Sequence, residues 1–186
     1  MIDSGRRSRI TFPRHMKSYL KILALLVFSV SALWAQEAKK KNWTPPSYKI
    51  YAQTLSDKIM AAHPELISIT FHGVPPGMKD TYTMFAGSYP DRIGNPDDPD
   101  DIDVMKLGVT TVDPRWHRMH DPIPKFVMMM PLRDKNGENC GLLVAAYRLS
   151  ANPGKGEKEF YLSGIGIRDD LEKDIPSYAA LFEPAK

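Results

Sequence analysis

The stretch that decides the fold is "PLRDKNGENCGLLVAAYRL", residues 131–149. Together with "KFVMMM" (125–130) just before it, it contains two apolar segments separated by a polar turn. Asn136-Gly137 in that turn is a strong hairpin signal, because both residues tolerate the positive φ that tight hairpin turns require. The pattern predicts two antiparallel strands, "KFVMMMPL" and "GLLVAAYRL", as neighbours in the middle of a sheet.

A helix and a strand are predicted ahead of this hairpin. In residues 44–63, apolar side chains recur every three or four positions, the spacing of one helix face. Thr44 is the expected N-cap with Pro45 in the first turn, and Pro64 ends the helix because the residue before proline avoids helical geometry. "LISITFH" (66–72) then alternates strictly between apolar and polar residues and predicts a half-buried strand.

Further short elements follow on both sides of the hairpin. We expect a strand at 81–88, a helix that Asp98 caps and Gly108 ends, and a short strand at 109–112. The C-terminal residues 158–167 fit a strand by composition and a helix by spacing. The two glycines among them weaken the helix, and the charge-rich residues that follow favour it.

The first 35 residues have the composition of a secretory signal and are expected to lie outside the fold. Two lysines precede an apolar core at 22–33, and small residues follow it up to Ala35. The core is shorter than the roughly 20 residues of a membrane span, so we expect cleavage near Ala35 and no transmembrane span in the mature form. Retention as an anchor is the alternative. Met16 is a better start than Met1, which makes residues 1–15 a candidate upstream extension.

Most of the positive charge belongs to this signal. The chain has a formal net charge of +3, but residues 1–35 hold six of its 25 Lys and Arg and one of its 22 Asp and Glu. The remainder is slightly acidic, with 19 basic and 21 acidic residues, and no nucleic-acid partner is expected. After the signal we expect a linker at 36–44 and one domain at 45–186, a length that suits a single core.

The sequence contains no clear catalytic motif. Cys140 is the only cysteine, which excludes an internal disulfide and the two-cysteine attachment of c-type haem. No histidine is placed to activate its thiol, so we interpret it as a buried bystander. No glycine-rich phosphate loop or nucleophile elbow is present. We therefore predict no catalytic residue and no cofactor, and favour a non-enzymatic function.

The order of the predicted elements resembles that of PAS-like extracytoplasmic sensor domains of the single Cache type. Two stretches carry the likeness: the paired strands around the D-x-x-G turn in 131–149, and the small helix "DDIDVMKLG" (100–108). The resemblance implies an α+β fold, with a curved antiparallel sheet of about five strands. A long N-terminal helix would pack on one face with a C-terminal helix following the sheet, and a small-molecule pocket would lie on the other face.

The same resemblance implies a sensor-like function. We expect an exported protein, periplasmic or secreted, that binds a small polar or anionic ligand between its sheet and the 113–125 loop. Such sensors usually sit between two membrane spans and signal to a cytoplasmic output domain, whereas this chain has one apolar segment at most. The domain is therefore expected to act without its own output domain, by itself or with a membrane-bound signalling partner.

The loop "RWHRMH" (115–120) supplies half of the candidate ligand-binding residues. An arginine there can bind a carboxylate bidentately, with the tryptophan covering it. His72 lies on the polar side of its strand, and in the resembling fold that side would line the pocket with two tyrosines; an exposed strand end is the alternative. The predicted set is Arg115, Trp116, His117, His72, Tyr82 and Tyr147.

Other interpretations of these residues stay open. The loop can equally be an ordinary surface loop anchored by Trp116 in the core. His117 and His120, with Met119, would suit copper or zinc in a periplasmic accessory protein or enzyme. A third alternative is a protein-interaction domain without a ligand. The acidic run 95–103 is interpreted as a helix cap and not as a calcium site, because it lacks EF-hand ligand spacing.

Overall fold

A computed structural model describes residues 40–114, 123–150 and 152–185 of the chain. Its centre is a five-stranded antiparallel sheet in the order β2-β1-β5-β4-β3. The fold is therefore α+β, as predicted. The strands are β1 (Leu66–Gly73), β2 (Thr83–Gly87), β3 (Thr111–Asp113), β4 (Lys125–Arg133) and β5 (Asn139–Arg148).

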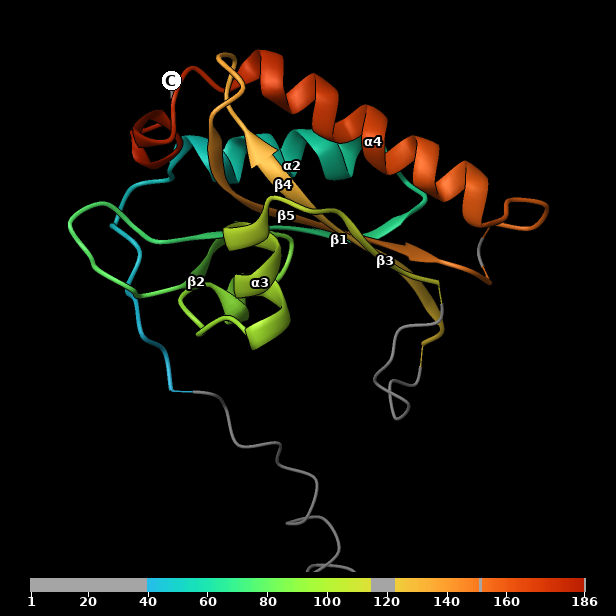
Figure 1. The fold of residues 1–186 in the computed structure, drawn as a ribbon, viewed down its shortest axis with the longest axis horizontal. Helices are drawn as coiled ribbons and strands as arrows, with labels where there is room; N and C mark the ends of the chain where they lie inside the picture. Colours follow the sequence, from blue (N-terminus) through green and yellow to red (C-terminus); the bar gives the residue numbers. More distant parts are fainter. Residues whose placement is uncertain (1–39, 115–122, 151, 186) are drawn as a thin grey trace, which may run out of the picture. The chain divides into compact units, whose positions relative to one another are not determined.

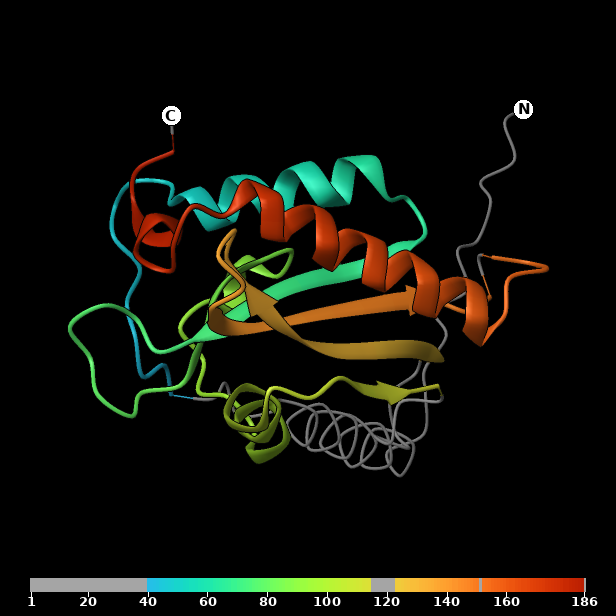
Figure 2. The same ribbon diagram turned by 45° about the horizontal axis from the view of Figure 1, so that its top comes forward.

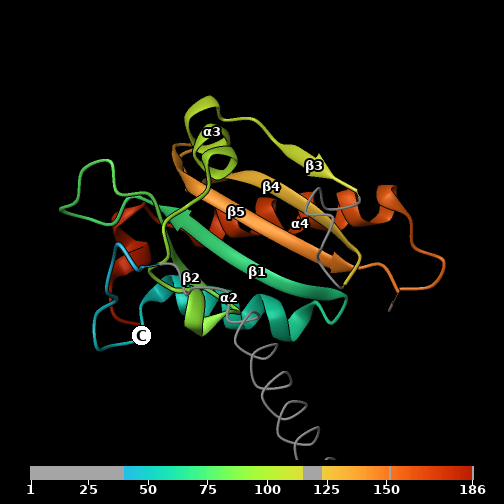
Figure 3. The same cartoon turned by 90° about the horizontal axis from the view of Figure 1, so that it is seen from below.

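Helices cover both faces of this sheet. The helical elements are α2 (Tyr51–Ala62), η2 (Pro90–Arg92), α3 (Pro99–Leu107), α4 (Glu157–Asp174) and η3 (Ala179–Phe182). Helices α2 and α4 lie side by side over one face (Figures 1 and 2), whereas α3 lies on the other face, against β4 and β5 (Figure 3). No helix within the described residues is long and apolar enough to cross a membrane.

The predicted hairpin is confirmed. Strands β4 and β5 pair antiparallel from Lys125↔Arg148 to Arg133↔Asn139, with β5 between β1 and β4 in the middle of the sheet. In the turn, the buried carboxylate of Asp134 accepts hydrogen bonds from the N–H groups of Asn136 at 2.8 Å and Glu138 at 3.2 Å. Gly137 takes a φ of 81°, in the left-handed region that glycine tolerates.

The N-terminal helix is shorter than predicted. It starts at Tyr51 and not near Thr44, and its N-cap residue Ile50 makes no side-chain cap hydrogen bond. The C-terminal segment supplies the missing partners instead: the N–H of Tyr51 donates to the carbonyl of Glu183 at 2.8 Å, and Ile50 forms a β-bridge with Pro184. The end of the helix is as predicted, with Ala62 its last residue.

The C-terminal region 157–174 is a helix, which settles the ambiguity at 158–167. At 18 residues, α4 is longer than the 12-residue α2. Gly164 lies where α4 approaches the sheet: a Cβ added there would be 2.5 Å from Sδ of Met128 on β4. Gly166 meets nothing within 4 Å. Gly164 therefore allows α4 to pack closely on the sheet, and Gly166 faces open space.

Strand alternation divides the core into two clusters. On the α2/α4 side, Ile69 and Phe71 of β1 join side chains from both helices. On the α3 side, Val104 and Met105 of α3 pack with a smaller set from β4 and β5: Val127, Met129, Leu142 and Ala146. His72 belongs to this second side, where it meets residues next to and within α3.

Candidate functional site

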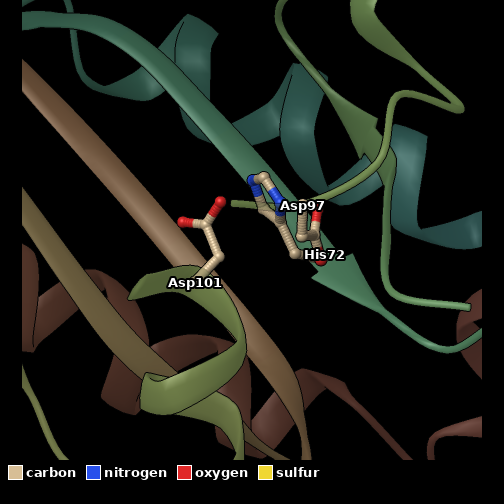
Figure 4. A group of neighbouring side chains, drawn as sticks. All are labelled: His72, Asp97 and Asp101. Atoms are coloured by element: carbon tan, nitrogen blue, oxygen red, sulfur yellow. Dashed lines mark hydrogen bonds and ion pairs between the residues drawn. The ribbon is translucent and has the colours of Figure 1, made fainter. Parts of the chain in front are cut away.

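Three titratable side chains from separate parts of the chain meet on the α3 side of β1. They are His72 near the end of β1, Asp97 in the segment before α3, and Asp101 in the first turn of α3 (Figure 4). One ligand atom from each residue lies within 4.8 Å of the others. We refer to these three residues as the His72 cluster.

Local structure explains why each side chain reaches the cluster. The pairing of β1 with β2 shifts register between Phe71 and His72. The Asp97 segment runs beside β2, since the N–H of Asp97 donates to the carbonyl of Tyr82 at 3.2 Å. Asp101 is held by the capping box of α3, in which its Oδ2 accepts the N–H of Asp98 at 3.1 Å. The predicted cap is thus confirmed, and it orients Asp101.

The hydrogen bonds of His72 fix its ring. Nδ1 lies 2.7 Å from Oδ1 of Asp97, and Nε2 lies 2.8 Å from Oγ1 of Thr70. The side chain of Asp97 is only 1% exposed, and its second oxygen, Oδ2, has no hydrogen-bond partner in the described part of the chain. A buried polar atom left unsatisfied costs about 1–3 kcal/mol, and more when it carries charge.

The electrostatics of the cluster favour positive charge. Burial opposes protonation of His72, but its hydrogen bond to Asp97 and the nearby charges of Asp97, Asp101 and Asp98 outweigh this and raise its pKa above the ordinary value. Burial raises the pKa of Asp101 as well, against the opposing effect of His72. A second cation, or a ligand with hydrogen-bond donors, would find acceptors here.

The arrangement of Thr70, His72 and Asp97 also has the order of hydroxyl, base and orienting carboxylate found in nucleophilic catalysis. The hydroxyl, however, belongs to a strand with neighbours on both sides, and Thr70 is only 7% exposed. A nucleophile has to reach its substrate, so the burial of Thr70 argues against this role. Binding suits the cluster better than catalysis.

Two of the predicted site residues lie on the α3 side. His72 is in the cluster, and it is buried rather than at an exposed strand end. Tyr82 is half-buried against the α3-side core, with Nζ of Lys106 at 5.4 Å from its ring centroid. Arg115, Trp116, His117, Met119 and His120 lie outside the described residues, so their predicted roles remain predictions.

Tyr147 does not lie where the sequence analysis expected it. It is fully buried on the α2/α4 side, stacked on Phe160 with ring centroids 5.1 Å apart. Its hydroxyl donates to Oγ of Ser163 on α4 at 3.2 Å. Since His72 faces the other side of the sheet, the two side chains cannot line one pocket.

Asp97 and Asp101 were not predicted as site residues. The acidic run was interpreted as a helix cap, which holds for Asp98 and Asp101. Asp97 precedes the N-cap, so its carboxylate does not cap the helix. This position before the cap was the one sequence signal that Asp97 has a different role. Its partner His72 is 25 residues away in the sequence, a separation that local patterns do not bridge.

A groove of about 340 Å³ lies on the opposite side of the molecule, between α2 and α4. The predicted pocket was expected on the face away from the N-terminal helix, so this groove is not that pocket. Its charged residues largely pair with one another, as in Lys58–Asp174 at 3.0 Å and Lys173–Asp170 at 2.8 Å. We therefore regard the His72 cluster, with its unsatisfied buried carboxylate, as the stronger candidate.

Comparisons with known proteins give similar structures but no family. No protein-family model matches the sequence, and no curated protein matches it. The E. coli DcuS sensor domain aligns over 53% of this chain and 67% of its own, at 17% identity and a TM-score of 0.38. The Agobacterium tumefaciens repressor BlcR aligns over 65% of each chain, at 12% identity and a TM-score of 0.38. TM-scores this low carry no argument about function. The function proposed below therefore rests on this chain's own residues.

Proposed function

We propose that the protein is a PAS-like, sensor-type domain that binds a small polar ligand on the α3 side of its sheet. The observation that carries this proposal is the buried Asp97 carboxylate, whose Oδ2 has no partner within the described residues. Binding sites commonly combine apolar walls with a few polar groups that orient the ligand. The α3-side core next to the cluster supplies such walls, with Tyr82 among its partly buried members.

The charge of the His72 cluster limits which chemical groups of a ligand can bind there. Two carboxylates flank a single imidazole, so the part of the ligand that meets them has to be cationic or a hydrogen-bond donor. An anionic ligand, as expected from the sequence, would have to place its negative group away from Asp97 and Asp101.

Export is part of the same proposal. Its support is the signal-like composition of residues 1–35, with a membrane-bound partner as the recipient of the binding signal. Expression in a Gram-negative host followed by N-terminal sequencing of the periplasmic protein tests it. A mature start near Gln36 is expected, whereas an intact N-terminus in the membrane fraction would favour the uncleaved anchor.

Ligand binding is tested by a thermal-shift screen of small amines, amino acids and carboxylates. A ligand at about 100 times its Kd stabilises the folded state by about 2.7 kcal/mol, which corresponds to a Tm rise of roughly 5–10 °C for a domain of this size. Asp97→Asn is expected to abolish the rise, because it removes the charge that meets the ligand.

The matched control is Lys58→Ala, which alters the α2/α4 groove and leaves the His72 cluster intact. It is expected to keep the full Tm rise. A rise that survives Asp97→Asn but disappears in Lys58→Ala would place the ligand in the groove. A screen without any rise would favour the protein-interaction alternative.

A further inference from the structure

We propose that His72, Asp97 and Asp101 form a binding site for one divalent transition-metal ion, Zn²⁺ or Mn²⁺. The inference deepens the proposed function and rests on it in one respect, namely that the α3 side is the ligand-binding side. Three protein ligands leave coordination positions open, and an anionic ligand could occupy one of them. The metal would then allow this acidic cluster to bind a ligand that carries a carboxylate.

The donor atoms are of the right type and lie near one another. One imidazole nitrogen and two carboxylate oxygens suit Zn²⁺ or Mn²⁺. In tetrahedral coordination, bonds of about 2.0–2.2 Å place two ligand atoms roughly 3.3–3.6 Å apart. The three atoms all lie within 4.8 Å of one another, so binding of an ion would draw the side chains together by up to about 1.5 Å.

Asp97 gives an independent indication that a cation belongs here. Its side chain is 1% exposed, and Oδ2 makes no hydrogen bond to any described residue. The other buried side-chain atoms without a partner in the described ranges are two neutral hydroxyls of α2, Thr54 Oγ1 and Ser56 Oγ. Asp97 is thus the one carboxylate of this group, and Figure 4 shows it gathered with His72 and Asp101.

Thr70 supplies the outer contact that metal-binding histidines usually have. Such a histidine donates its second ring N–H to an oxygen, which fixes the ring and leaves the other nitrogen free for the metal. Nε2 of His72 lies 2.8 Å from Oγ1 of Thr70, and Nδ1 faces Asp97. When a metal ion displaces the Nδ1 proton, Nε2–H donates to Thr70 and the lone pair of Nδ1 points to the side where Asp97 lies.

The dipole of α3 disfavours a cation at this site, but the negative charges of the site outweigh it. Asp101 stands in the first turn of α3, where the helix carries the equivalent of roughly half a positive charge. The two carboxylates of the site contribute a larger opposite charge when ionised, and Asp100 adds acidic character in the same turn. The local balance therefore remains favourable to a divalent ion.

The test measures metal binding directly on the full-length protein. After removal of metal with a chelator, ZnCl₂ and MnCl₂ are titrated separately by calorimetry, and bound metal is quantified by elemental analysis. We expect one ion per chain. Asp97→Asn and Asp101→Asn should each weaken binding at least tenfold. Both keep a side-chain oxygen, so in the metal-free protein the hydrogen bond to His72 and the capping box of α3 can still form.

Two control variants make the result specific. Asp103→Asn removes the same charge from an exposed position on α3 and should leave the affinity unchanged. The double variant His117→Ala, His120→Ala should also bind normally, whereas a loss of metal there would assign the ion to the 113–125 loop. Circular dichroism confirms that each variant is folded.

Several outcomes would overturn the metal site: no stoichiometric ion in the wild-type protein, unchanged affinity in Asp97→Asn, or equal weakening by Asp103→Asn. The proposed function is judged separately, by repeating the thermal-shift screen in the presence of chelator. A ligand-dependent shift that persists without metal would leave ligand binding standing when the metal site has failed.

Discussion

The packing of α4 on the sheet leads to a sharp prediction at Gly164. Alanine there would place a Cβ 2.5 Å from Sδ of Met128, 3.2 Å from its Cε and 3.4 Å from Oη of Tyr147. Met128 and Tyr147 are both fully buried, so neither can move aside freely. Overpacking of this kind costs about 1–3 kcal/mol, against a gain of about 1 kcal/mol from helix propensity.

Gly166 on the same helix is the matched control. It meets nothing within 4 Å, so Gly166→Ala should stabilise the protein by up to about 1 kcal/mol through helix propensity alone. The propensity gain is common to both variants, and the difference between them isolates the overpacking. We expect Gly164→Ala to be less stable than Gly166→Ala by about 1–3 kcal/mol.

Urea unfolding followed by circular dichroism measures both variants. Met128→Ala should lose about 2–5 kcal/mol on its own, and adding Gly164→Ala to it should then be neutral or stabilising, because the obstructing sulfur is gone. The double-mutant cycle should therefore give a favourable coupling within the usual 0.5–3 kcal/mol, about the size of the overpacking. If Gly164→Ala proves as stable as Gly166→Ala, the inferred seating of α4 on β4 is wrong.

Two further predictions concern buried polar groups on the α2/α4 side. Tyr147→Phe removes the hydrogen bond to Ser163 and should lower the free energy of unfolding, measured by urea titration, by about 0.5–1.5 kcal/mol. Calorimetry should show unchanged affinity for ligand and metal. A changed affinity would contradict the side of the sheet assigned to Tyr147. Burial raises the pKa of Cys140 from 9.0 to about 12, so the wild type should lose stability relative to Cys140→Ala by on the order of 1 kcal/mol per pH unit above about pH 9. Below that pH the thiol is protonated in both folded and unfolded chains, and the two proteins should respond to pH alike; parallel curves throughout would refute the shift.

The sequence predicted those elements whose signals are local. The hairpin followed from Asn136-Gly137 between two apolar segments, and β1 from strict alternation at 66–72. Helix α3 was specified by its own end signals, with Asp98 at the N-cap and Gly108 at φ 65° at the other end. In each case the backbone geometry is set by residues a few positions apart, which a sequence displays directly.

The start of α2 depended on distant contacts. Thr44 and Pro45 are good helix-start residues, but the chain stays non-helical until Tyr51 because Glu183 and Pro184 bond to the backbone there. The length of the helix was thus decided by a segment more than 130 residues away, and tertiary hydrogen bonds overrode local propensity.

The sequence did not show which face of the sheet carries the side chain of Tyr147, and here the reason is a different one. β5 is a central strand with apolar residues on both sides, since Leu143 and Ala145 belong to one core cluster and Leu142 and Ala146 to the other. A strand buried on both faces shows no apolar–polar alternation, so its sequence does not reveal which side chains share a face. Only its register against β1 assigns Tyr147 to the α2/α4 side.

By itself, then, the sequence determined the strands, the turn and the capped helix of this protein, because backbone preferences and alternation act between near neighbours. Tertiary structure alone brought His72 to Asp97 and Asp101, set Tyr147 apart from them, and gave Gly164 its packing role. These relationships depend on how the strands pair and which faces the helices cover, and such long-range choices are made by burial of the whole core.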